Sequence, residues 1–251
     1  MTPRVKQIIL FLHLHKGAGT FLCNMAKTNN MRVGGGGNCL VQVDQRCCGG
    51  DTREEQYNFT KSTNFDFVAN ENYMYANLDP TLFIHVTILR DSWSRYVSHF
   101  GHVKRAYGLK DSLLTWIRGQ PDNWNVRHIC GTRCMLRPKF GLSREDYAYT
   151  RARLRMFRHV IRLPAGAGNL SAFHRDVAAL CRGLKWSKCN TMRRVNAGQQ
   201  SESQLQPPWQ LTALDDCLFS DLPIFLCPNA LRYLKLERMV GNPCGAACTV
   251  Y

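Results

Sequence analysis

The sequence predicts an α/β fold: a single three-layer domain with a parallel sheet and helices on both faces. Two strand–loop–helix units carry this expectation. In the first, the apolar run Gln7–Leu14 leads through a small-residue turn into a helix over 20–27. In the second, Leu82–Leu89 leads into a helix that Asp91 or Ser92 can cap. Strands that alternate with helices favour a parallel sheet that binds ligands at the carboxyl ends of its strands.

The remaining elements are expected around these two units. Tyr96 and Phe100 follow Trp93 at helical spacing and are expected to face the core. Further strands are expected at 65–69 and 158–163, and further helices at 111–118, 144–157, 170–181 and 231–239. The segment 34–50 is expected to be a loop held by Cys39, Cys47 and Cys48. Residues 1–251 then form one domain, with a core over roughly 7–196 and a C-terminal loop and helix over 197–251.

The charge balance points to an anionic partner. Lys and Arg number 33 against 18 Asp and Glu, so the formal net charge is +15. Nucleic acid, acidic glycan, anionic lipid and a multiply charged nucleotide would all complement it. Basic residues are spread through the periodic segments, with one dense group at Arg151, Arg153, Arg155 and Arg158. This distribution favours a folded, basic cleft over a charged tail.

Twelve cysteines indicate an oxidising compartment. Structural zinc is the alternative, but Cys130-x3-Cys134 does not have the spacing of a zinc ribbon. Sequons at Asn58 and Asn169 are compatible with passage through the secretory pathway as a glycoprotein. The apolar run at 8–14 is too short to span a bilayer, so we expect membrane association only through an anchor that this sequence does not show.

The first unit has the composition of a phosphate-binding loop. Lys16 precedes Gly17, Ala18 and Gly19, whose small side chains allow backbone N–H groups to approach a phosphate, and Thr20 opens the helix behind them. The order differs from the Walker A pattern, in which the Lys follows the glycines. Packing of a small-residue turn is the alternative explanation.

The second unit supplies a possible partner for that loop. Arg90 stands where the strand ends, and Ser98 lies two helical turns beyond Asp91. Arg90 and Ser98 can therefore converge on one anion. The alternative is that Arg90 pairs with Asp79 or Asp91 and that Ser98 is merely exposed.

Together the two units resemble the Golgi carbohydrate sulfotransferases related to heparan sulfate 2-O-sulfotransferase. The stretch from Phe11 to Thr20 is similar to the family's 5′-phosphosulfate loop, although His15 replaces its usual Pro. The stretch from Thr87 to Phe100 is similar to its 3′-phosphate motif, although Ser92 replaces the Pro after Arg-Asp. Fainter similarity extends over roughly 7–196.

The resemblance implies a fold, a cofactor and a setting. It implies a core like that of P-loop nucleotide kinases and a sulfotransferase of the Golgi lumen. The donor would be 3′-phosphoadenosine 5′-phosphosulfate (PAPS), and the acceptor a carbohydrate such as an acidic glycan, with no metal and no nucleic acid. Residues 16–20 would surround the 5′-phosphosulfate, and Arg90 and Ser98 would hold the 3′-phosphate. Lys16 would also stabilise the leaving oxygen during transfer.

The acceptor hydroxyl needs a general base. Glu71 follows the strand at 65–69 and is the preferred candidate, with an exposed loop carboxylate as its alternative. His85 lies inside an apolar strand and is expected to be a packed, hydrogen-bonded core residue, while His99 and His102 are expected to be solvated or structural. Two further groups could contact ligands but are weaker candidates: Asn123, Asn125 and Arg127, and Arg193, Arg194 and Asn196.

Two rival functions also fit the sequence. One is a non-catalytic, disulfide-stapled module that holds acidic glycan or nucleic acid on its basic surface. The other is a phosphoryl-transfer enzyme on a related core, which would need a Ser or Thr directly after the loop Lys. Gly17 occupies that position.

Overall fold

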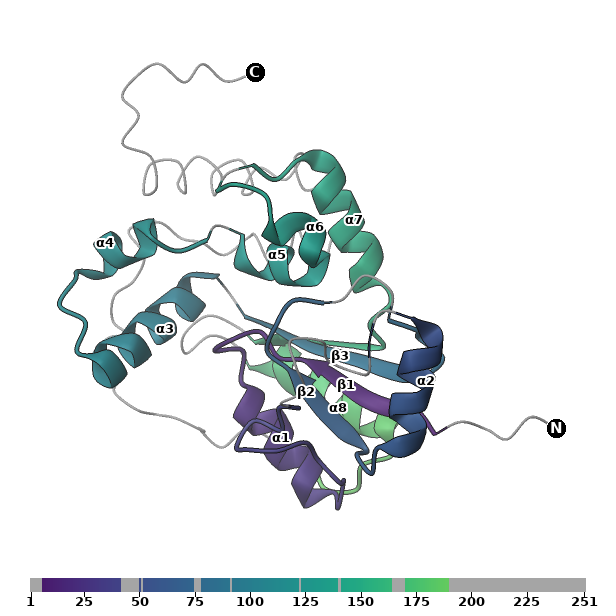
Figure 1. Ribbon diagram of the computed structural model, residues 1–251. Helices are drawn as coiled ribbons and strands as arrows, with labels where there is room; N and C mark the ends of the chain where they lie inside the picture. The colour runs from purple at the N-terminus through teal and green to yellow at the C-terminus, as the bar shows by residue number, and fades with distance from the viewer. Residues whose placement is uncertain are drawn as a thin grey trace.

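A computed structural model of the chain describes residues 6–41, 50, 52–74, 78–90, 92–121, 123–139, 141–163 and 170–189. Its sheet consists of β1 (Ile8–Leu12), β2 (Phe67–Asn70), β3 (Phe83–Arg90) and β4 (His159–Leu163). The strands pair in parallel throughout, in the order β2-β1-β3-β4 (Figure 1). The predicted α/β class and parallel sheet are confirmed. That the chain is one domain stays a prediction.

Helices surround this sheet. They are α1 (Gly19–Thr28), α2 (Arg53–Ser62), α3 (Ser92–Tyr107), α4 (Leu113–Arg118), α5 (Trp124–Cys130), α6 (Thr132–Met135), α7 (Arg144–Leu154) and α8 (Ser171–Leu184). The helices expected from the sequence do not include α2, α5 or α6. The buried positions of α2 are Gln56 and Thr60, so apolar periodicity cannot reveal it; its signal is the capping box of Thr52 and Glu55. The helix expected over 231–239 lies outside the described residues.

Strand alternation produces the two buried layers. Ile9 and Phe11 of β1 pack in a cluster with α1 and α8, which includes Phe21 and Phe173. The intervening β1 residues, including Leu10, pack on the other face in a cluster with α5 and α7. Helices thus cover both faces of the sheet, and the predicted three-layer arrangement is confirmed for the described residues.

A smaller apolar cluster joins α3 to α4. Tyr96, Phe100 and Trp116 are buried together in it. The expectation that Tyr96 and Phe100 face a core is confirmed, whereas the side chain of Trp93 lies outside the described residues.

Three disulfides join described cysteines: Cys23–Cys39, Cys130–Cys134 and Cys181–Cys189. Cys39 does hold the 34–41 segment, but its partner is Cys23 inside α1. Cys47 and Cys48 lie outside the described residues. Disulfides are typical of oxidising compartments, which is consistent with a secreted or lumenal protein. No helix in the described ranges is long and apolar enough to cross a membrane.

One of the two sequons, at Asn58, lies on a described helix. Asn58 is exposed on α2, where a glycan would be accessible, although the hydroxyl of Thr60 is buried and donates a hydrogen bond to the carbonyl of Tyr57. Asn169 lies outside the described residues.

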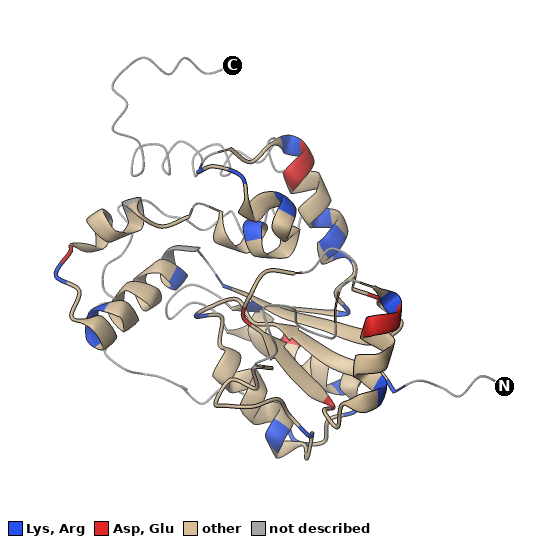
Figure 2. Ribbon diagram, in the orientation of Figure 1, with Lys and Arg blue, Asp and Glu red and all other residues tan. Residues whose placement is uncertain are grey.

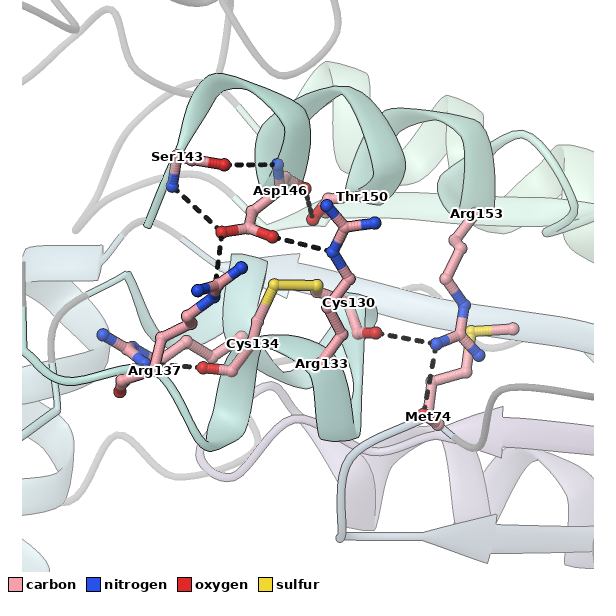
Figure 3. Close-up of a disulfide and its surroundings, with 10 residues drawn as sticks. Met74, Cys130, Arg133, Cys134, Arg137, Ser143, Asp146, Thr150 and Arg153 are labelled. Atoms are coloured by element: carbon pink, nitrogen blue, oxygen red, sulfur yellow. Dashed lines mark hydrogen bonds and ion pairs between the residues drawn. A yellow bond between two sulfur atoms is a disulfide. The ribbon is translucent and has the colours of Figure 1, made fainter. Parts of the chain in front are cut away.

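The Cys130–Cys134 disulfide lies beside a buried network that fixes α7 against α6 (Figure 3). The Asp146 carboxylate accepts hydrogen bonds from the Ser143 amide and the Arg133 guanidinium, and Arg137 lies 3.6 Å from it. Ligand atoms of Cys130, Cys134 and Asp146 lie within 4.8 Å of one another. They do not fit a metal ion, because the sulfurs bond each other and two cations engage the carboxylate.

Part of the basic charge is structural. Arg127 and Arg153 are both buried. The Arg127 guanidinium donates to the carbonyl oxygens of Cys134, Arg137 and Pro138, while that of Arg153 donates to those of Met74 and Cys130. The group at 151–158 is therefore not a uniform basic cleft. Acidic residues gather in the first turns of α2 and α7, where they complement the helix dipole (Figure 2).

His85 gives a testable stability effect. It is buried in β3 near Phe83 and Phe157, as expected, but neither ring nitrogen has a hydrogen-bond partner among the described residues. Burial, with the Arg153 charge, lowers the pKa of His85 to about 4. The unfolded chain therefore binds a proton more readily between about pH 6.5 and pH 4, and stability falls as pH falls through that window.

We expect His85→Phe to reduce this acid sensitivity. The slope of the unfolding free energy against pH should decrease by up to about 1.4 kcal/mol per pH unit within the window. Urea unfolding at several pH values measures it, with His174→Phe on α8 as the control. An unchanged slope would contradict the assignment of His85 as a neutral buried histidine.

Candidate functional site

Sheet order brings three predicted site segments to one edge. β1 lies between β2 and β3, and all three strands are parallel. Glu71 directly follows β2, the loop at 13–18 follows β1, and Arg90 is the last residue of β3. The carboxyl ends of parallel strands are the usual place for ligands in such sheets. The predicted juxtaposition of the loop and Arg90 is therefore present.

The loop after β1 has the backbone form of an anion cradle. Lys16 and Ala18 adopt left-handed conformations, with φ of 64° and 60°, on either side of Gly17. Left-handed residues within such turns direct successive N–H groups into one concavity. No group in the described ranges accepts from the amides of Ala18, Gly19 or Thr20, and the first turn of α1 has no acidic residue and no side-chain cap. The positive end of α1 is thus open to an anion.

Packing alone explains the two glycines of the loop. A Cβ on Gly17 would lie 2.7 Å from the carbonyl oxygen of Leu14 and 3.2 Å from that of Ile88. A Cβ on Gly19 would lie 1.9 Å from Nε2 of His13, whose ring is buried against it. The case for anion binding therefore depends on the open amides and the nearby cations, and not on the glycines.

Cations converge on this loop. Nη1 of Arg90 donates to the carbonyl oxygen of Lys16 at 3.1 Å, which fixes the strand end against the loop. Asn125 of α5 in turn donates to the carbonyl oxygen of Arg90 at 3.1 Å. The pKa of Lys16 is lowered, first by burial and then by the charges of Arg105 and Arg90, against the opposing effect of Glu71. The positive charges of Lys16, Arg90 and Arg105 therefore act together on the loop, and only one described carboxylate lies near them.

That carboxylate is Glu71, and it is bound to histidine. Oε1 of Glu71 lies 2.8 Å from Nδ1 of His15 and 3.7 Å from Nδ1 of His13. Burial acts to raise the pKa of Glu71, but the hydrogen bond with His15 and the charges of His13 and Lys16 outweigh it and hold the pKa below its usual range. Glu71 is thus at the site, as predicted, and is not a free loop carboxylate.

Two histidines of α3 lie beside the group formed by Glu71, His13 and His15. The rings of His99 and His102 lie 4.5 Å and 6.1 Å from the ring of His15, each with its plane at 63° to it. Burial, followed by the charges of His15 and Arg95, lowers the pKa of His99 to about 4. Both histidines therefore lie beside the candidate site, and their solvated or structural role stays a prediction.

The structure also shows where several of the other predicted site residues lie. The Thr20 hydroxyl donates to Oδ1 of Asn38 at 2.7 Å, which ties α1 to the 34–41 segment. Ser98 is half-buried on α3, next to His99. Arg127 is buried and its guanidinium donates to three backbone carbonyl oxygens, so it stabilises the fold. The positions 193, 194 and 196 lie outside the described residues.

Sequence reasoning missed part of the site. No sequence pattern singles out His13, His15 stands out only as the replacement for a family proline, and Arg105 lies near the end of α3. The available signal was the spacing of His99, His102 and Arg105 at three-residue intervals, which places them on one face of a helix. Their meeting with His15 depends on how α3 lies against the sheet edge.

Comparison of the chain with models of known protein families, with characterised proteins and with solved structures gave no match in any of the three. The function therefore has to be inferred from the geometry of the site.

Proposed function

We propose that this protein is a PAPS-dependent sulfotransferase that moves a sulfuryl group to a carbohydrate hydroxyl. The observation that carries the proposal is the contact between Arg90 and the Lys16 carbonyl, which brings a cation from each of two adjacent strand ends to the open amides of α1. The resemblance of both segments to the phosphate motifs of Golgi sulfotransferases supports the same ligand, and with it a core like that of P-loop nucleotide kinases.

The residues have separate roles in this reaction. The open amides of Ala18, Gly19 and Thr20 and the Lys16 ammonium hold the 5′-phosphosulfate, whereas the Gly17 amide already donates to the carbonyl oxygen of Leu14. Arg90 with Ser98 holds the 3′-phosphate. The acceptor oxygen bonds to sulfur as the bond between sulfur and the bridging oxygen breaks. In this reaction Lys16 neutralises the charge that develops on that oxygen. The acceptor proton passes to a base in the Glu71 region.

The secretory setting is part of the proposal. Disulfides and the sequon on α2 fit an enzyme of the Golgi lumen that acts on glycans. A basic surface also suits an acidic glycan acceptor.

Arg90→Ala tests the nucleotide site. Calorimetry with 3′-phosphoadenosine 5′-phosphate (PAP) should show binding to the unaltered chain and about 10²-fold weaker binding to the variant, because a charged hydrogen-bond donor to phosphate is lost. Arg175→Ala, an exposed position on α8, is the matched control and should bind normally.

PAP binding, together with assays of sulfate transfer and magnesium dependence, separates the rival functions. A non-catalytic module would retain heparin without binding PAP or transferring labelled sulfate. A phosphoryl-transfer enzyme would require magnesium and a nucleoside triphosphate. Absence of PAP binding by the unaltered chain would reject the sulfotransferase proposal.

A further inference from the structure

The hydrogen bond between His15 and Glu71 determines which imidazole nitrogen can accept a proton. An ionised carboxylate accepts hydrogen bonds and donates none. The lowered pKa of Glu71 keeps it ionised at neutral pH. In neutral His15 the Nδ1 atom, 2.8 Å from Glu71, therefore carries the hydrogen. The lone pair is left on Nε2, and this tautomer is the one that a histidine base requires.

Nε2 of His15 is buried and forms no hydrogen bond with the residues that the structure describes. A buried polar atom without a partner costs free energy, so its retention calls for an explanation. Its surroundings are Glu71 after β2, His13 and Lys16 on its own segment, His99 and His102 on α3, and His128 on α5. Because Nε2 is buried, an acceptor reaches it only when a covering side chain moves.

Glu71 itself is poorly suited to take the proton. One of its oxygens is engaged by His15, and its lowered pKa makes it a weaker base than an ordinary carboxylate. His15, in contrast, directly precedes Lys16, which faces the leaving oxygen in the proposed reaction. The base and the cation would then both lie in the loop after β1, beside the transferred sulfuryl group.

We propose that His15 is the catalytic base and that Glu71 is its positioning residue. This assignment rests on the proposed sulfotransferase function. As the acceptor oxygen bonds to sulfur, its proton passes to Nε2 of His15. The bond from sulfur to the bridging oxygen breaks, and PAP leaves with the electron pair. Glu71 holds the imidazole and stabilises the imidazolium that forms.

The hydrogen-bond geometry can be tested without turnover. Nitrogen-15 NMR of labelled histidine in the intact protein should show His15 as the tautomer protonated on Nδ1. Glu71→Gln should shift that signal toward a mixture of tautomers, because an amide can also donate. A His15 signal protonated on Nε2 in the unaltered chain would overturn the assignment.

Kinetics test the division of roles. With labelled PAPS and an acceptor glycan identified by screening, His15→Asn should lower kcat about 10²–10⁴-fold. PAP affinity measured by calorimetry should stay within a few-fold of normal. The acid limb of the pH–rate profile should disappear in His15→Asn and persist in Glu71→Gln. His174→Asn, on α8, should leave both rate and profile unchanged.

Two failures are distinguishable. If His15→Asn keeps the acid limb while Glu71→Gln loses it, Glu71 is the base and the present assignment is wrong, although the sulfotransferase proposal stands. If the unaltered chain neither binds PAP nor transfers sulfate, the proposed function fails and the catalytic role of His15 fails with it.

Discussion

Replacement of Lys16 by alanine is expected to lower sulfuryl transfer about 10³-fold, with a smaller effect on PAP affinity. In the proposed reaction the ammonium faces charge that grows on the bridging oxygen only as the bond to sulfur breaks, so its loss affects the transition state more than the bound state. Single-turnover measurement of labelled sulfate transfer gives the rate, and calorimetry gives the affinity. Lys27→Ala, which removes an exposed lysine from the last turn of α1, the helix after the loop, should change neither.

The pH dependence of the same step has a definite sign. Because burial and the nearby cations lower the pKa of Lys16, its ammonium is lost at a lower pH than that of an ordinary lysine. The rate should therefore fall on the alkaline side, and this limb should be absent from the residual activity of Lys16→Ala. A variant with the full rate, or one that loses only PAP affinity, would contradict the leaving-group role.

Arg127→Ala is expected to give the largest loss of stability. Its buried guanidinium donates to three carbonyl oxygens that close the turn after α6, at 2.7 to 2.8 Å. Removal leaves these acceptors to find water or remain unpaired, which should cost about 3 kcal/mol. In a chain of this size the melting temperature should drop by about 10 °C. Differential scanning calorimetry measures it.

The control for this variant is Arg155→Ala, which removes an exposed arginine just beyond α7. That change should alter the melting temperature by little. If Arg127→Ala melts normally but loses PAP binding, Arg127 belongs to the ligand site and its structural role is wrong.

Prediction from sequence worked best where a signal is local. The runs that became β1 and β3 are strongly apolar, and the polar or small residues that follow them mark where the strands end. Parallel pairing then places those ends together, so Lys16, Arg90 and Glu71 could be assigned to one edge before their contacts were known. The helices α2 and α5 were missed because polar residues such as Gln56, Asn125 and Arg127 occupy their buried positions.

The loop after β1 shows what the sequence determines by itself and what depends on the tertiary structure. The sequence by itself determined the α/β class, the loop with its lysine and the arginine at the neighbouring strand end, because apolar periodicity and turn composition act over a few residues. Only the tertiary structure decided that Glu71 binds His15, that His99 and His102 lie against it, and that Arg127 and Arg153 serve the fold. Those contacts join residues from separate elements, and their distances depend on how helices pack on the sheet.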